Sequence, residues 1–147
     1  KKEQLDLLFK MRKANVTKKA YDNLSITPLH CACINPNPAA LRHFLEVGDD
    51  LYTYDLELRK PVHYAACSQT PDNLKVLAEK GVDIRDSDKI RKTPLMYACQ
   101  YGRLENVKFI LENAQCNIDQ KCRIARGPIH FAVEYGHFGN LLYTINF

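Results

Sequence analysis

The sequence contains no long apolar run, and this absence argues against a membrane-spanning helix. None of its runs approaches the roughly 18 consecutive apolar residues that such a helix needs. The first residues carry acids, Glu3 and Asp6, within their first apolar stretch, which is not the pattern of a signal peptide. We therefore expect no signal peptide and no membrane partner.

The sequence also lacks a strong charge of either sign. Its formal net charge is +4 over 147 residues, of which 46% are apolar and 26% are charged. This balance is typical of a single folded domain rather than of a disordered tail. The basic excess is too small by itself to indicate a nucleic acid or an anionic membrane surface.

Motifs for catalysis and for cofactor binding are missing as well. The chain has no G-x-S-x-G nucleophile motif, no P-loop and no G-x-G-x-x-G dinucleotide motif. His30, His63 and His130 recur at one position of a repeating pattern, which favours a structural role over a catalytic one. We predict that the chain is not an enzyme and uses no cofactor.

The six cysteines do not follow a metal-binding pattern. No C-x-x-C pair is present, and the spacing of Cys31 and Cys33 is not typical of zinc ligands. An even number of cysteines would suit a disulfide framework in a short secreted chain. Here Cys31, Cys33, Cys67 and Cys99 lie within apolar helical patterns, where a free cysteine acts as a small hydrophobic residue. We predict no metal site, reduced thiols and an intracellular location, in the cytoplasm or the nucleus.

One pattern occurs four times along the chain at a nearly constant interval. Each copy has a proline, an aliphatic residue one position later and an alanine four positions later. The prolines are spaced by 33, 33 and 34 residues. The copies are residues 27–33 (TPLHCAC), 60–66 (KPVHYAA), 93–99 (TPLMYAC) and 127–133 (GPIHFAV). Such self-similarity indicates a repeat architecture.

Two helices are expected in each repeat. Proline is tolerated at the first helical position, and Thr27 and Thr93 are good N-caps before it. A second helix is indicated by apolar residues spaced by three and four, namely Leu41, Phe44, Leu45; Leu74, Leu77; Val107, Ile110, Leu111; Leu141 and Ile145. Gly48 and Gly81 follow second helices, where a left-handed C-cap is expected. The polar and β-branched residues before each next proline predict a turn and an exposed hairpin.

These segments resemble the ankyrin repeat, whose marks are T-P-L-H-x-A-A, a G-H joint, V-x-x-L-L and G-A-D-V-N. The resemblance extends from Asp22 to the end of the chain, and more loosely over the residues before it. It implies an all-α solenoid of stacked helix–turn–helix units whose hairpin loops are called fingers. It also implies a concave surface, made by the first helices and the fingers, that binds other proteins without catalysis.

The resemblance divides the single domain, residues 1–147, into units. We expect a partial or irregular repeat at 1–21, full repeats at 22–54, 55–87 and 88–121, and a truncated repeat at 122–147. The segment 141–147 is apolar and no finger follows it, so we expect a fragment of a longer protein that contacts neighbouring repeats or domains. The alternative is that the last helix forms an unusual cap.

The chain departs from the family pattern at the finger turns and at the caps. The turn glycine of the family is replaced by Ser25, Leu58, Arg91 and Ala125. These turns either adopt another conformation or hold a non-glycine residue at a conformational cost. Lys60 and Gly127 replace the capping threonine, and Met96 replaces the histidine of the third copy.

Candidate partner-binding residues lie where the repeats differ, because such positions do not serve the common fold. After the core of the first helix they are Ser68, Gln100, Tyr101, Glu134 and Tyr135. In the fingers they are Tyr52, Tyr54, Leu56, Leu58, Arg85, Lys89, Arg91, Lys121 and Arg123. Tyrosine is a favoured interface residue, although tyrosines here could merely cover the joint between two helices. The cations of the later fingers suit an acidic or phosphorylated segment, or serve solubility alone.

Three hypotheses for function follow from these features. The leading one is a protein–protein interaction module that binds a segment of another protein, of acidic character, on the concave groove and the finger tips. The first alternative is a nucleotide or RNA ligand held by basic fingers and tyrosines, which the low net charge and the lack of an RNA-binding motif disfavour. The second alternative is a purely structural spacer within a larger protein.

Overall fold

The computed structural model describes residues 25–147, and the predicted partial repeat at 1–21 lies outside these residues. The described residues form helices joined by loops and contain no strand, as the all-α prediction requires. The helices are α2 (Pro28–Ile34), α3 (Ala39–Glu46), α4 (Pro61–Ala66), α5 (Asp72–Glu79), α6 (Pro94–Gln100), α7 (Leu104–Asn113), α8 (Pro128–Glu134) and α9 (Phe138–Asn146).

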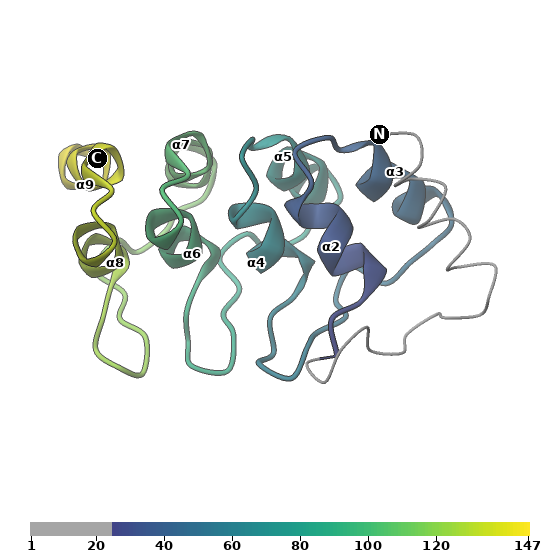
Figure 1. Cartoon of the computed structure of the whole chain (residues 1–147), viewed down its shortest axis with the longest axis horizontal. Helices are drawn as coiled ribbons and strands as arrows, with labels where there is room; N and C mark the ends of the chain where they lie inside the picture. Colours follow the sequence, from purple (N-terminus) through teal and green to yellow (C-terminus); the bar gives the residue numbers. More distant parts are fainter. Residues whose placement is uncertain (1–24) are drawn as a thin grey trace.

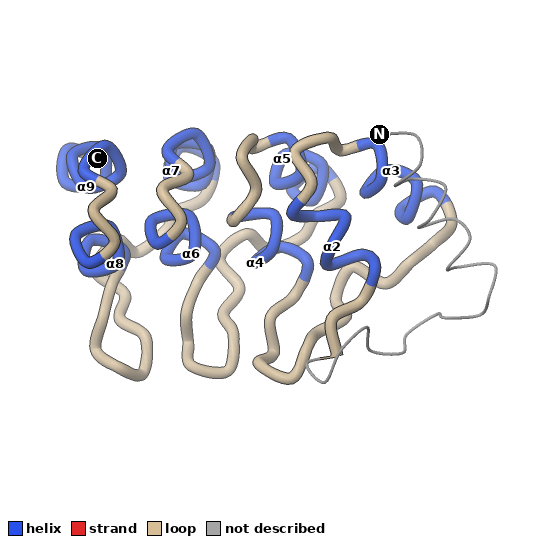
Figure 2. Tube along the Cα trace, viewed as in Figure 1, coloured by secondary structure: helices blue, strands red, loops and turns tan. Residues whose placement is uncertain are grey.

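The helices pack as four successive pairs arranged in two rows (Figures 1 and 2). The first helices α2, α4, α6 and α8 contact one another in sequence along one row. The second helices α3, α5, α7 and α9 form the other row. Three long loops extend to the edge opposite the second helices: the first finger (residues 47–60), the second finger (80–93) and the third finger (114–127). The predicted solenoid of helix pairs and fingers is therefore confirmed.

Each first helix begins at its proline, as predicted, and a histidine caps three of the four. The histidine Nδ1 accepts a hydrogen bond from the backbone N–H of the residue before the proline. The pairs are Thr27–His30 (3.1 Å), Lys60–His63 (3.0 Å) and Gly127–His130 (3.1 Å). Loss of the threonine hydroxyl at two of these positions therefore leaves the helix start with a side-chain partner.

Helix α6, the first helix of the third pair, is capped by its threonine and not by a histidine. Met96 has replaced the histidine, and the Thr93 hydroxyl accepts a hydrogen bond of 3.4 Å from the Met96 backbone N–H. Every first helix thus keeps at least one of the two capping side chains. Thr27 and His30 provide both at the start of α2, where the threonine hydroxyl lies 2.8 Å from Nδ1.

Small residues and a buried amide hold the pairs together. The recurring alanines are almost inaccessible, with exposures of 1% for Ala32 and 0% for Ala65, Ala98 and Ala132. Three asparagines of the second helices were not predicted to have a role. Each donates from Nδ2 to carbonyl oxygens at the end of the first helix of the preceding repeat. These bonds join Asn73 to Cys33 (2.8 Å) and Asn35 (2.6 Å), Asn106 to Ala66 (3.0 Å) and Ser68 (2.8 Å), and Asn140 to Ala98 (3.2 Å). They satisfy carbonyls that a helix end leaves without partners.

The finger turns keep the left-handed geometry of the family without its glycine. The φ angles are +61° at Ser25, +56° at Leu58, +63° at Arg91 and +60° at Ala125. Of the two outcomes considered, the second is confirmed: these positions hold a non-glycine residue at a conformational cost. The predicted left-handed C-caps at Gly48 and Gly81 are also confirmed, since φ is +79° at both.

One predicted core position in the last pair is wrong. Ile145 was expected on the buried face of its helix, but its side chain is 57% exposed. Asn140 must face inward to reach the Ala98 carbonyl, and Thr144, one turn later, is buried and donates its hydroxyl to the Asn140 carbonyl at 2.7 Å. This rotation of α9 leaves Ile145 on the outside.

Candidate functional site

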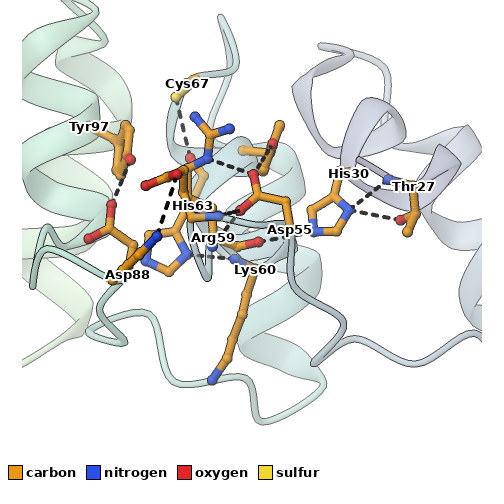
Figure 3. Close-up of polar contacts among 12 residues, drawn as sticks. Thr27, His30, Asp55, Arg59, Lys60, His63, Cys67, Asp88 and Tyr97 are labelled. Carbon is orange, nitrogen blue, oxygen red and sulfur yellow. Dashed lines mark hydrogen bonds and ion pairs between the residues drawn. The ribbon is translucent and has the colours of Figure 1, made fainter. Parts of the chain in front are cut away.

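A buried carboxylate joins each of the first two fingers to the helix that follows it, α4 or α6 (Figure 3). Asp55 Oδ1 accepts hydrogen bonds of 2.9 Å from the backbone N–H groups of Glu57 and Arg59, and Oδ2 accepts one of 2.6 Å from the Tyr64 hydroxyl. Asp88 is placed in the same way, and its Oδ2 accepts the Tyr97 hydroxyl at 2.8 Å. The carboxylate thus fixes the turn and the helix together.

Charge completes this arrangement in the first finger. Arg59 Nε donates to Asp55 Oδ2 at 2.7 Å, and its guanidinium lies 5.3 Å from the centre of the Tyr64 ring. Burial alone would raise the pKa of Asp55, but the bonds from Tyr64 and Arg59 lower it. The Arg59 carbonyl accepts a bond of 3.1 Å from His30 Nε2, which ties the finger to the preceding repeat.

The third finger lacks both partners of this closure. Cys122 occupies the position of the carboxylate, and Phe131 occupies the position of the tyrosine. Both side chains are buried, at 5% and 4% exposure. The turn is still closed by a backbone hydrogen bond of 2.9 Å from Cys122 to the Arg126 carbonyl. Two buried apolar side chains therefore stand in the third finger where the first two fingers have a polar pair.

Lys92 in the second finger is held between aromatic rings. Its ammonium lies 4.2 Å from the centre of the Tyr97 ring and 4.3 Å from that of Phe131, and its Nζ donates to Gln100. The residue is only 7% exposed, and burial lowers the pKa of the amine. Lys92 therefore joins the third and fourth helix pairs.

Basic residues at the ends of the fingers meet the ends of the first helices on one surface. We call this surface the finger face and define it by Arg59, Lys92, Arg126, Gln100, Tyr101, Glu134 and Tyr135. Arg126 forms an ion pair with Glu134, as Lys92 contacts Gln100 eight residues later. The phenols of Tyr101 and Tyr135 are within electrostatic range of each other, and burial raises the pKa of Tyr101. Both rings remain open to solvent, at 48% and 50% exposure.

Four of the five candidates at the ends of the first helices lie together on the finger face. These are Gln100, Tyr101, Glu134 and Tyr135. Ser68 is the exception among the helix candidates, because its side chain is 1% exposed. The prediction that this position is accessible is wrong, since the Ser68 carbonyl binds Asn106 and the residue turns inward.

The finger candidates are all exposed, but they differ in their contacts. The apolar ones lie in the first finger, with exposures of 52% for Tyr52, 61% for Tyr54, 54% for Leu56 and 44% for Leu58. Arg85 forms two hydrogen bonds with Asp83, and Lys89 lies 3.9 Å from Glu57. Within residues 25–147, no ion pair involves Arg91, Lys121 or Arg123.

The sequence analysis did not name Arg59, Lys92 and Arg126 as site residues. Their signal was present, because a basic residue stands two positions before the proline in three copies of the repeat. Two of these three charges, Arg59 and Lys92, lie against aromatic rings, which the local sequence does not indicate.

Other kinds of site find little support in the part of the chain that the structure describes. Among residues 25–147, no three His, Cys, Asp or Glu side chains gather as a metal site would require. None of the helices there has the length and apolar character that crossing a membrane requires. All six cysteines are free thiols, and burial raises the pKa of Cys67 to about 12.

Comparison with known proteins agrees with the geometry. The chain matches the family model described as ankyrin repeats (3 copies) over residues 1–88 and 85–144. No curated protein matches the chain significantly. The family match covers nearly the whole sequence, and the helix pairs, capping residues and fingers are those of the family fold, so this protein belongs to the ankyrin-repeat family.

Proposed function

We propose that this chain binds a segment of another protein on its finger face and finger tips. Ankyrin repeats are generally protein-interaction modules, and this chain carries no feature that separates it from that role. The observation that supports the proposal most strongly is the pair Tyr101 and Tyr135. Both are half exposed, although they stand at the ends of well-packed helices. Rigid aromatic side chains of this kind are the usual anchors of protein interfaces.

The packing beneath this surface supports binding without a large change of shape. Asp55, Asp88 and Lys92 fix the fingers to the helices through buried contacts. A surface held in this way loses little conformational entropy when a partner binds. We propose that the partner segment is acidic, because three cations of the later fingers, Arg91, Lys121 and Arg123, form no ion pair within residues 25–147.

A nucleotide ligand has a weaker basis. A cleft of about 300 Å³ between the second and third fingers is lined by Asp83, Arg85, Cys116, Asn117 and Gln120, among others. Its one cation, Arg85, is already paired with Asp83, so a phosphate there would have to displace a carboxylate. The spacer hypothesis predicts no partner for the isolated chain and is tested by the same experiment.

A pull-down from cell lysate tests the proposal. The wild-type chain is compared with a variant carrying Tyr54→Ala, Tyr101→Ala and Arg123→Glu, all on the finger side. A matched control carries Phe138→Ala, Leu142→Ala and Arg42→Glu, which change exposed residues of α9 and α3. Circular dichroism first establishes that all three proteins melt alike.

The proposal predicts a protein that the wild type and the control retain and the finger-side variant loses. If the finger-side variant retains every partner of the wild type, the finger face is not the binding surface. If no protein is retained by any of the three, the spacer hypothesis is favoured. We further propose that the six free thiols place the chain in a reducing compartment inside the cell.

A further inference from the structure

The tips of the three fingers form one continuous surface. We call it the tip row and define it by residues 56–58, 89–91 and 123–125. The Lys89 backbone N–H donates to the Glu57 carbonyl at 2.9 Å, and the Arg123 N–H donates to the Ile90 carbonyl at 2.8 Å. Neighbouring tips are therefore in direct contact along the edge opposite the second helices (Figure 1).

The two ends of the tip row differ in chemistry. The first finger contributes Leu56 and Leu58, which are 54% and 44% exposed, beside the exposed rings of Tyr52 and Tyr54. Exposed apolar side chains grouped on one loop mark an interaction surface more often than single ones do. The second and third fingers contribute Lys89, Arg91 and Arg123, with Lys121 close by in sequence. Glu57 is the only carboxylate in the row.

The cations of the tip row have no close acidic partner within residues 25–147, a property that they share with Arg42, Lys80 and Arg103. Arg91, Lys121 and Arg123 form no ion pair within residues 25–147, and the contact of Lys89 with Glu57 is a long one of 3.9 Å. Several cations elsewhere are neutralised at shorter range, as in Lys60–Asp86 (2.5 Å), Arg59–Asp55 (2.7 Å) and Lys108–Glu105 (2.9 Å).

The opposite edge of the molecule has the reverse balance. The helices α3, α5, α7 and α9 carry the acids Glu46, Asp72, Glu79, Glu105 and Glu112 against the cations Arg42, Lys75 and Lys108. An anionic partner is therefore attracted to the finger edge and repelled from the second helices. This asymmetry orients the encounter before any side chain is in contact.

We infer that the tip row docks a short protein segment in which apolar residues adjoin a cluster of carboxylates. The apolar residues contact Leu56, Leu58 and the neighbouring tyrosines, and the carboxylates contact Arg91 and Arg123. This inference rests on the proposed function and adds the composition of the bound segment. Leu56 and Leu58 favour a protein segment over a nucleic acid, because apolar side chains can cover these leucines, whereas bases stack on aromatic rings.

A binding experiment with designed peptides tests the inference. The probe is a fluorescently labelled peptide with two leucines followed by four glutamates. It is compared with peptides in which lysines replace the glutamates or serines replace the leucines. A single-stranded RNA of similar length and vesicles of an anionic phospholipid serve as the competing ligand classes. Affinity is measured by fluorescence anisotropy at physiological salt, and vesicle binding by sedimentation.

The inference predicts that the leucine–glutamate peptide binds most tightly. Lys121→Glu with Arg123→Glu should weaken its binding by at least about tenfold, whereas the matched pair Arg42→Glu with Lys75→Glu, on α3 and α5, should change it by less than about twofold. Leu56→Ser should weaken the leucine–glutamate peptide but leave the serine–glutamate peptide unchanged. All variants are checked for an unchanged melting curve.

Other outcomes overturn the inference. The charge contact is wrong if the lysine peptide binds as well as the glutamate peptide, or if both double variants weaken binding equally. The segment is the wrong ligand class if RNA or vesicles bind more tightly than the peptide and lose affinity in Lys121→Glu with Arg123→Glu. If no peptide binds while the single variant Tyr101→Ala still loses the captured partner in the pull-down, the proposed function stands and the tip row is not its docking surface.

Discussion

The second and third fingers have the same turn, but different side chains are buried between the finger and the helix that follows it. In the second finger, Asp88 binds two backbone N–H groups and the Tyr97 hydroxyl. In the third, Cys122 and Phe131 occupy the same positions, and the turn is closed by backbone hydrogen bonds between Cys122 and both Arg126 and Ala125. Either a satisfied polar pair or an apolar pair can be buried there, but a mixture would leave a polar group without a partner. The two positions must therefore change together.

The first and largest predicted effect removes the carboxylate from the second finger. Asp88→Ala leaves two buried N–H groups and the Tyr97 hydroxyl without an acceptor, so the free energy of unfolding should fall by about 3 kcal/mol. Cys122→Ala removes only a small apolar group and should lower it by about 1 kcal/mol. Urea denaturation of both variants measures the difference. Equal losses would show that the two fingers are closed in the same way.

A second experiment transfers the polar pair into the third finger. Cys122→Asp and Phe131→Tyr should each destabilise the chain by about 1–3 kcal/mol, because each buries a polar group without its partner. The double variant should recover about 1–2 kcal/mol of the summed loss through a new hydrogen bond, as a double-mutant cycle measures. Strictly additive losses would contradict the paired interpretation.

A third prediction concerns pH and the capping histidines. Burial lowers the pKa of His30 and His63 below the ordinary value of 6.5, so in the acid range the unfolded chain binds more protons than the folded one. Stability should thus be complete above about pH 7.5 and fall as the pH is lowered through about 6.5. Asp86 and Asp88 lie within electrostatic range of His63 and moderate this loss.

The variant His63→Met isolates this effect, because Met96 already stands at the same position in the next repeat. It should flatten the dependence of the unfolding free energy on pH between about pH 7.5 and 5.5. A pH dependence identical to that of the wild type would mean that His63 does not contribute.

The smallest predicted effect comes from the left-handed turns. Ala125→Gly should stabilise the chain by about 0.5–1 kcal/mol, because relief of the strain at φ +60° outweighs the greater freedom of glycine in the unfolded state. Ala39→Gly, at the exposed start of α3, should instead destabilise it by about 0.5–1 kcal/mol. Thermal melts suffice for this comparison. Equal shifts in the same direction would show that the turn stores no strain.

The fold could be predicted from the sequence because each mark of the repeat depends only on nearby residues. Proline, the following aliphatic residue and the alanine each act within one turn of helix, so they can be recognised without knowing the neighbours. Asn106 was overlooked although it recurs with the repeat, because the carbonyls that it binds lie about 40 residues away in sequence.

The candidate site was harder to predict because exposure depends on the partners of each side chain. Tyr101 and Tyr135 are half exposed, as an accessible helix end requires, and their role in binding stays a prediction. The burial of Ser68 was not predicted, because its carbonyl accepts a hydrogen bond from Asn106, which lies in the next repeat and not in the local sequence. The burial of Lys92 could not be predicted from its own finger, because the rings of Tyr97 and Phe131 that cover it come from two different repeats.

Site-specific photo-crosslinking in cells tests the central claim, that partners bind the finger side of this chain, most directly. A photoreactive amino acid replaces Tyr101 on the finger face in one protein and Lys75 on α5 in another, both at exposed positions. We predict a discrete cross-linked protein from position 101 and none from position 75. A partner captured only from position 75, or equally from both, would contradict the claim.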